Sequence, residues 1–287
     1  MEILIADHSG FCEGVERAYQ LALKQAEQGR PVFMLGNLVH NAQVVEELKH
    51  QGIKTVKNLN EIPLHTNGLL LISAHGVPPE IYENAKKLGL EIVDTTCPWV
   101  KRAQNLVKQL SDQGDAIVIV GDEDHPEVKG LLGWAGASAI VVEGPSDLAG
   151  IESLNIFQMG VGVVAQTTQS EVNFEAVVSR LREKFSNLTV YKTICGATSK
   201  RQNAAIDLAK KVDLMLVIGD KMSANTKRLT ELCSATGTET HQIQTGSELD
   251  YKWLAEKNRI GVTAGASTPD WVIAEIISLL KSQRQPA

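Results

Sequence analysis

The sequence of 287 residues lacks paired cysteines, clusters of basic residues and long apolar runs. Its four cysteines lie far apart and form no C-x-x-C pair, which disfavours a disulfide scaffold and leaves metal binding, catalysis or burial. A formal charge of −6 disfavours a nucleic-acid or anionic membrane surface, because such binding needs a local excess of Lys and Arg. No apolar stretch approaches the roughly 20 residues that span a bilayer, and "MEILIADHSG" has no signal-peptide pattern. We therefore expect a cytoplasmic protein with no nucleic-acid or membrane partner.

Short runs rich in Val, Ile and Leu alternate with amphipathic helical patterns along the whole chain. The runs include "LLLIS", "AIVIV" and "LMLVIG", and the helical patterns include "WVKRAQNLVKQLSDQ" and "RQNAAIDLAKKV". Continuous apolar strands that alternate with helices are typical of parallel sheets covered on both faces. The sequence therefore predicts an α/β fold.

Three segments of the sequence share one plan: a strand, a polar break, a cysteine, a helix, and a second strand that ends in a polar residue. In each segment that polar residue follows the cysteine by 28 positions; the pairs are Cys12 with His40, Cys97 with His125, and Cys195 with Ser223. A third strand in each segment ends at another polar position; these are His75, Thr167 with Thr168, and Ser267. We predict three related α/β units, at 1–95, 96–192 and 193–280, and a C-terminal tail at 281–287.

The repeated cysteines and polar residues are all expected beyond the carboxyl ends of strands, where ligands of open α/β sheets bind. Three units with mostly parallel sheets, arranged as a trefoil around a central cavity, would bring the three repeated thiols together. Three thiolates can hold a 4Fe-4S cluster with one open iron or a zinc ion. Alternatively each Cys is a small buried residue, which the matched spacing disfavours. Cys233 falls on an apolar helix face and is predicted to be core.

Taken together, the motifs resemble the LytB/IspH family of 4-hydroxy-3-methylbut-2-enyl diphosphate reductases. They follow one another in the family's order along nearly the whole chain, and the three-lobed α/β fold of that family agrees with the repeat. The matching stretches are "GFCEGVERA" at 10–18, "LVHN" at 38–41, "SAHGVPP" at 73–79, "DTTCPWV" at 94–100, "HPEVKG" at 125–130, "QTTQS" at 166–170, "TICGATSKRQ" at 193–202, "SAN" at 223–225 and "VTAGASTPDWV" at 262–272.

The resemblance implies a role for individual residues of these motifs. Cys12, Cys97 and Cys195 would be the three ligands of the 4Fe-4S cluster. Glu127 would be the proton donor, and Thr167 would lie near the hydroxyl end of the substrate. The residues that would bind the diphosphate are His40, His75, His125, Ser223, Asn225 and Ser267. Imidazole and hydroxyl groups beside helix N-termini can bind a diphosphate without a lysine-rich surface.

The implied reaction is a reductive dehydration that yields isopentenyl and dimethylallyl diphosphate in the non-mevalonate pathway of isoprenoid biosynthesis. Its two electrons would come from an external donor such as ferredoxin or flavodoxin, because we find no convincing flavin or nicotinamide site. "GVGVVA" at 160–165 fits G-x-G-x-x-A, but it lies within a strand pattern and opens no helix. The four tryptophans could line a pocket or dock an electron donor, although aromatic residues in helical patterns are more often core.

Two motifs depart from the family pattern. Ala224 stands where the family commonly has a second serine before the asparagine, which removes one hydroxyl contact to an anion. The family usually reads "GHxGHPE" where this chain has "GDEDHPE", which adds Asp122 and Asp124. Facing the pocket, these carboxylates would repel a diphosphate and raise the pKa of Glu127; facing solvent, they would do little. Three alternatives remain open: a paralogue acting on another allylic or unsaturated substrate, a zinc hydratase or hydrolase using the same thiols, and a non-catalytic iron-sulfur sensor.

Overall fold

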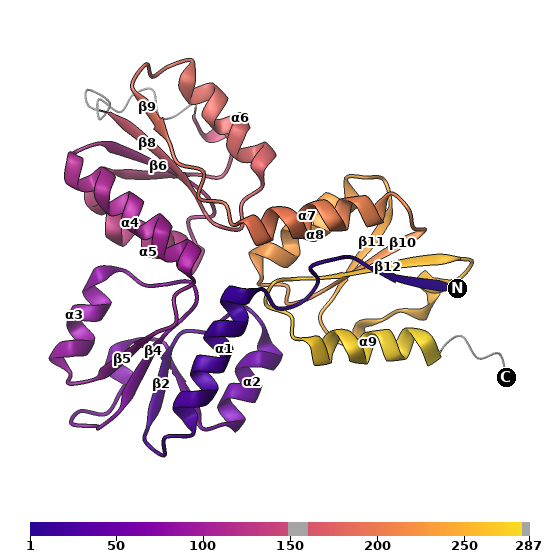
Figure 1. Cartoon of the computed structure of the whole chain (residues 1–287), viewed down its shortest axis with the longest axis horizontal. Helices are drawn as coiled ribbons and strands as arrows, with labels where there is room; N and C mark the ends of the chain where they lie inside the picture. Colours follow the sequence, from indigo (N-terminus) through magenta and orange to yellow (C-terminus); the bar gives the residue numbers. More distant parts are fainter. Residues whose placement is uncertain (149–159, 283–287) are drawn as a thin grey trace. The chain divides into compact units, whose positions relative to one another are not determined.

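The computed structural model describes residues 1–148 and 160–282 (Figure 1). Their strands form three four-stranded sheets in which every strand pair is parallel. The α/β class and the three similar units predicted from the sequence are confirmed. Residues 283–287, most of the predicted tail, lie outside the described residues. No helix within the described ranges has both the length and the apolar character needed to cross a membrane.

The chain divides by its internal contacts into two compact units. One comprises Met1–Glu16, Val39–Glu47 and Gly196–Ala287 and contains one sheet. The other comprises Arg17–Leu38 and Leu48–Cys195 and contains the other two sheets. Two of the boundaries between these units fall within helices, one in α1 (Glu13–Ala26) and one in α2 (Ala42–His50).

The first sheet of the larger unit has the strand order β3-β2-β4-β5. Its strands are β2 (Val32–Leu35), β3 (Ile53–Val56), β4 (Leu69–Ile72) and β5 (Glu91–Asp94), and the helix α3 (Pro79–Lys87) connects β4 to β5. All four residues of β4 are buried, as a central strand covered on both faces requires. Pro79 opens α3, where the missing N–H of proline costs no hydrogen bond.

The second sheet of the larger unit has the order β7-β6-β8-β9. Its elements are β6 (Ala116–Val120), β7 (Ala139–Val142), β8 (Val161–Ala165), β9 (Leu188–Val190), α4 (Pro98–Gln113), α5 (Pro126–Ala135) and α6 (Glu171–Arg182). The stretch "GVGVVA" therefore lies almost entirely in β8, as its strand pattern predicted.

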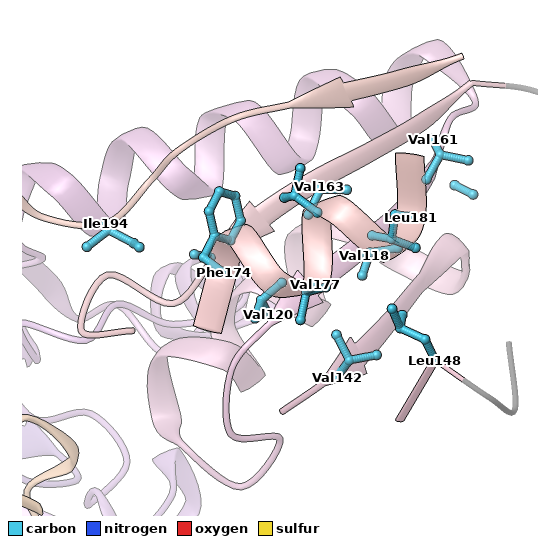
Figure 2. Packing of buried hydrophobic residues seen from close by; sticks show 13 residues of the cluster. Val118, Val120, Val142, Leu148, Val161, Val163, Phe174, Val177, Leu181 and Ile194 are labelled. Carbon is cyan, nitrogen blue, oxygen red and sulfur yellow. The ribbon is translucent and has the colours of Figure 1, made fainter. Parts of the chain in front are cut away.

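Both faces of this second sheet are covered by helices. Alternate residues of β6 point to opposite sides of the sheet and therefore belong to two different cores. Val118 and Val120 pack with Phe174 and Val177 of α6 in the core shown in Figure 2. Ile117 and Ile119 belong to a different core, which α4 and α5 supply from the other face. The two helices α4 and α5 contact each other along that face (Figure 1).

The sheet of the smaller unit has the order β1-β12-β10-β11. Its elements are β1 (Glu2–Ile5), β10 (Leu214–Ile218), β11 (Glu239–Ile243), β12 (Arg259–Ala264), α7 (Gly196–Ala209), α8 (Ala224–Ser234) and α9 (Asp270–Ser282). Cys233 of α8 is fully buried in a core with Ala205 and Leu229, so its predicted place in the core is confirmed. Short 3-10 helices occur at Leu59–Glu61, Gly136–Ser138, Gly246–Glu248 and Tyr251–Leu254.

The three sheets share one topology in which β5, β9 and β1 occupy the same edge position. Each of these edge strands pairs with the strand that leads to His75, Thr167 or Ser267: β5 with β4, β9 with β8, and β1 with β12. Residues 2–5 therefore complete the C-terminal sheet rather than a sheet of the first unit. The unit boundaries at 95 and 192 remain a proposal. Because of this pairing, we assign residues 2–5 to the third unit.

Candidate functional site

Each of the three repeated cysteines lies between an edge strand and the first residue of a helix. Cys12 precedes α1, Cys97 is the N-cap of α4, and Cys195 precedes α7. The backbone N–H of each donates to the carbonyl of the second residue after β12, β4 or β8: Cys12 to Ala266 at 3.3 Å, Cys97 to Ala74 at 3.0 Å, and Cys195 to Thr167 at 3.0 Å. One local arrangement is thus repeated three times. The meeting of the three thiols at one point stays a prediction.

The environment of these three thiols differs from that of Cys233. All four cysteines are thiols; the three repeated ones are partly exposed, whereas Cys233 is buried. Burial raises the pKa of the Cys233 thiol to about 11, which keeps it protonated and unreactive. The positive end of a helix dipole favours a thiolate. Position at helix N-termini therefore makes Cys12, Cys97 and Cys195 the better metal ligands.

Glu127 lies in the first turn of α5 and is only 2% exposed. One of its carboxylate oxygens accepts a hydrogen bond from the backbone N–H of Thr167 at 2.6 Å, and the other accepts from the Thr167 hydroxyl at 2.8 Å. Burial raises the pKa of Glu127 to about 7, against the lowering effect of both Thr167 hydrogen bonds. The carboxyl group therefore exchanges its proton near neutral pH, as a general acid must.

His125 and His75 lie close together in the larger unit. Their rings meet edge to face with centres 5.2 Å apart. Nδ1 of His125 accepts a hydrogen bond from the backbone N–H of Glu127 at 3.1 Å and so caps α5. This acceptor role at Nδ1 assigns the ring proton of neutral His125 to Nε2. His125 thus orients the start of the helix that holds Glu127.

Gly76 fixes the turn that follows His75. Its φ is +72°, and a Cβ at this position would collide with the side-chain amide of Gln104 on α4. Only glycine combines this backbone conformation with such a close approach. The motif "SAHGVPP" therefore requires glycine at position 76, because no other residue would let this turn pack against α4.

The smaller unit brings together a second group of predicted residues. The Ser267 hydroxyl donates to the carbonyl of His40 at 2.9 Å and lies 3.5 Å from the Ser223 hydroxyl. Ser223 is the N-cap of α8, where its hydroxyl accepts from the N–H of Thr226 at 3.3 Å. Burial lowers the pKa of His40 against the opposing effect of Asp220, so a neutral imidazole is favoured. These hydroxyls lie beside the positive end of α8.

Asn225, in the first turn of α8, is 4% exposed. Within the described part of the chain, neither the oxygen nor the nitrogen of its side-chain amide has a hydrogen-bond partner. A buried amide without partners is costly. A polar ligand at this helix end would supply the missing hydrogen bonds.

Asp220 is a residue of this group that the sequence analysis did not single out. It is 7% exposed, and its carboxylate accepts from the backbone N–H groups of Ala42 at 2.9 Å and Met222 at 2.7 Å. It thereby holds the segment after His40 to the turn before Ser223. The signal available in the sequence was its position directly after the strand "LMLVIG", shared with Asp122 after "AIVIVG".

Asp122 and Asp124 both face solvent, which decides between the two outcomes considered for them. Asp124 has a side chain that is 96% exposed and pairs with Lys129 at 3.1 Å. Asp122 accepts a hydrogen bond from the backbone N–H of Asp124 at 2.9 Å. Neither contributes to the raised pKa of Glu127, whose cause is burial. These substitutions therefore do little to the charge around Glu127.

The replacement Thr167→Val tests the hydrogen bond between the Thr167 hydroxyl and Glu127. The ionised carboxylate would lose a hydrogen bond worth about 1.5 to 3 kcal/mol, so we expect the pKa of Glu127 to rise further above about 7. The carboxyl stretching band followed by infrared spectroscopy against pH measures this. Thr168→Val is the matched control, because the hydroxyl of Thr168 bonds Gln166 rather than Glu127. An unchanged titration in Thr167→Val contradicts the assigned contact.

Comparison with known proteins gives matches along almost the whole chain. A family model described as LytB protein matches residues 3–281. The curated 4-hydroxy-3-methylbut-2-enyl diphosphate reductases of Geobacter metallireducens and Geobacter sulfurreducens are 43% and 45% identical to the chain. Each of these two alignments covers 98% of this chain and 97% of the relative.

Solved structures give the same result at the level of the fold. The E-1-hydroxy-2-methyl-but-2-enyl-4-diphosphate reductase from Plasmodium falciparum matches with a TM-score of 0.92 at 30% identity, over 98% of this chain and 88% of that one. A structure of (E)-4-hydroxy-3-methyl-but-2-enyl diphosphate reductase, the terminal enzyme of the non-mevalonate pathway, matches with a TM-score of 0.70 at 39% identity, over 98% and 100%. With a family model that matches from residue 3 to residue 281, the chain belongs to the LytB protein family.

Proposed function

We propose that this chain is a 4-hydroxy-3-methylbut-2-enyl diphosphate reductase, an oxidoreductase of the non-mevalonate pathway. It converts its substrate to isopentenyl and dimethylallyl diphosphate by reductive dehydration. The observation that carries the proposal is the buried Glu127, held by Thr167 and with a pKa near neutrality, in a chain that curated reductases match over 98% of its length. We also propose that it acts in the cytoplasm.

A 4Fe-4S cluster fits the donor set of Cys12, Cys97 and Cys195. The support is that all three are partly exposed thiols directly before helices and are fastened in the same way to their sheets. Thiolates are the usual ligands of such clusters. Held by these three cysteines, such a cluster would supply electrons one at a time and a Lewis-acid iron for the substrate.

Glu127 provides the proton that the departure of the hydroxyl requires. The overall reaction consumes two electrons and two protons, breaks the allylic C–O bond and releases water. Because the pKa of Glu127 is raised to about 7, a large fraction of its carboxyl groups carries the proton at neutral pH. The Thr167 hydroxyl orients the carboxyl group and stabilises its ionised form after the proton has left.

The diphosphate is bound by neutral hydrogen-bond donors at the helix ends. In the smaller unit these are Ser223, Ser267, His40 and the amide of Asn225, whose lack of protein partners fits a ligand at the first turn of α8. His75 and His125, whose rings meet edge to face, are the other residues that we propose for diphosphate binding. Backbone N–H groups in the first turn of α8 include that of Ala224, so the absent serine hydroxyl removes only one of several donors.

The test is an anaerobic assay of the purified, iron-reconstituted protein. Iron, sulfide and zinc are quantified first, and turnover of 4-hydroxy-3-methylbut-2-enyl diphosphate is then measured with a chemical reductant. We expect close to four irons and four sulfides per chain, taken from the cluster stoichiometry, and formation of both diphosphate products. One zinc with no sulfide overturns the cluster and favours a hydratase or hydrolase. A full cluster without turnover leaves the sensor or the paralogue.

A further inference from the structure

Trp99 and Arg102 lie at the beginning of α4, directly after Cys97. Trp99 is 36% exposed, and the guanidinium carbon of Arg102 lies 5.8 Å from the centre of its ring. The sequence left open whether the tryptophans are core or binding residues, and this one is partly exposed. Trp and Arg are the residue types most enriched at the energetic centres of protein interfaces. This pair is therefore suited to contact another protein.

Arg102 also lines an open cavity of about 550 Å³ whose other cationic groups are Arg17 and Lys101. The only acidic residue of the lining is Asp94, and it is paired with Lys101 at 2.8 Å. Three cationic groups thus face one carboxylate, on a chain whose formal charge is −6. The local charge is opposite in sign to that of the whole protein.

The cavity adjoins one of the proposed cluster ligands. Thr96 and Pro98, the residues on either side of Cys97, both belong to its lining. Nη1 of Arg17 donates to the carbonyl of Thr96 at 3.4 Å, and the carboxylate of Asp94 accepts from the backbone N–H of Thr96 at 3.0 Å. A partner seated on this surface would therefore lie beside the backbone segment that carries Cys97.

We infer that the surface formed by Arg17, Trp99, Lys101 and Arg102, termed here the α4 docking surface, binds the electron donor, and that this donor is a small redox protein with an acidic surface. The inference rests on the proposed reductase function, which requires electrons from outside. The reduced donor loses one electron in each encounter. Two encounters supply the pair that, together with two protons, releases the substrate hydroxyl as water.

A protein partner is favoured over a small anion by the character of the cavity. Small-molecule pockets are mostly enclosed and lined by apolar groups. This cavity is open, its lining includes charged and amide side chains, and an exposed tryptophan lies beside it. Opposite charges on two proteins accelerate their encounter and make the rate sensitive to ionic strength. A redox partner that must bind and leave quickly gains most from such steering.

Charge reversal at Arg102 tests the α4 docking surface in the cluster-loaded protein. We expect Arg102→Glu to lower the second-order rate of reduction by a reduced acidic ferredoxin about tenfold at low ionic strength, with the difference shrinking as salt is raised. Turnover driven by dithionite with methyl viologen should be unchanged. Asn105→Glu is the second variant, because it adds a carboxylate to the lining without removing a cation. Arg180→Glu is the matched control on the exposed face of α6.

Binding of oxidised ferredoxin, measured by titration calorimetry, gives a readout that is independent of turnover. Weaker binding in Arg102→Glu and Asn105→Glu, but not in Arg180→Glu, supports the inference. If the wild-type protein fails to reduce the diphosphate with dithionite, that result overturns only the proposed function and leaves the binding result standing. Wild-type binding and reduction rates in both variants overturn the inference. The inference is also overturned if inorganic pyrophosphate binds at this surface without competing with ferredoxin.

Discussion

Glu127→Gln is expected to lower turnover by about 100- to 10,000-fold, the usual contribution of a general acid. The substitution preserves the local geometry, because a glutamine oxygen still accepts from the N–H of Thr167 and its NH₂ group can donate to the Thr167 hydroxyl. It removes the proton that we propose Glu127 gives to the leaving hydroxyl. The measurement is the anaerobic assay with a chemical reductant, and the iron and sulfide contents should match those of the wild type. Unchanged turnover would exclude Glu127 from the reaction.

The same variant has an effect on stability that does not depend on substrate or metal. The pKa of Glu127 is raised by burial from 4.5 to about 7, so the folded chain holds a proton that the unfolded chain has lost between these two pH values. The stabilising contribution is complete below pH 4.5 and disappears as the pH rises to about 7. It amounts to about 3 kcal/mol.

Denaturant titrations of the two proteins against pH measure this contribution. The free energy of unfolding of the wild type, minus that of Glu127→Gln, should fall by about 3 kcal/mol between the unfolded and folded pKa values. If this difference in unfolding free energy did not change between the two pKa values, Glu127 would be ionised in the folded protein over that whole pH range. Thr167→Val should displace the same curve to higher pH.

Cys97→Ser is expected to abolish cluster retention and to lower turnover more than about 100-fold, since loss of a ligand costs more than loss of a group that only supports one. The fold should survive, because Cys97 is the N-cap of α4 and serine is among the best N-cap residues. Iron and sulfide analysis with the absorption spectrum measures the cluster, and circular dichroism checks the fold.

Cys233→Ala is the matched control for the ligand. Its thiol is buried in an apolar core and keeps its proton, so removal should cost only about 1 kcal/mol of stability. Iron content and turnover should be those of the wild type. A Cys97→Ser protein with wild-type iron and sulfide, or a Cys233→Ala protein without them, would mean that the cluster ligands have been assigned wrongly.

The fold was predictable because buried parallel strands leave an unambiguous sequence pattern. Runs such as "AIVIV" became β6, whose five residues are all buried, and the spacing from Cys to polar strand end revealed the repeat. The sheet to which "EILI" belongs was not predictable. An apolar strand carries no information about its neighbour, and β1 pairs with a strand near the other end of the chain.

The candidate site was predictable in its residue types but not in its contacts. The polar strand ends were identified from the repeat, and the roles of Glu127 and Thr167 were implied by resemblance; their two hydrogen bonds needed the structure. Asp220 was missed although it follows its strand as Asp122 does, because only the structure shows that its carboxylate holds two backbone segments. The direction of Asp122 and Asp124 also required coordinates, since the sequence allowed either face.

The pairing of β1 with β12 has a consequence for biosynthesis. Cys12 leaves the ribosome long before Ala266, whose carbonyl accepts its N–H, has been made. Contacts between such distant segments form late and slowly. The backbone at Cys12 therefore lacks this anchor until the segment around Ala266 has been made, and we expect any metal that Cys12 holds to be loaded only after that.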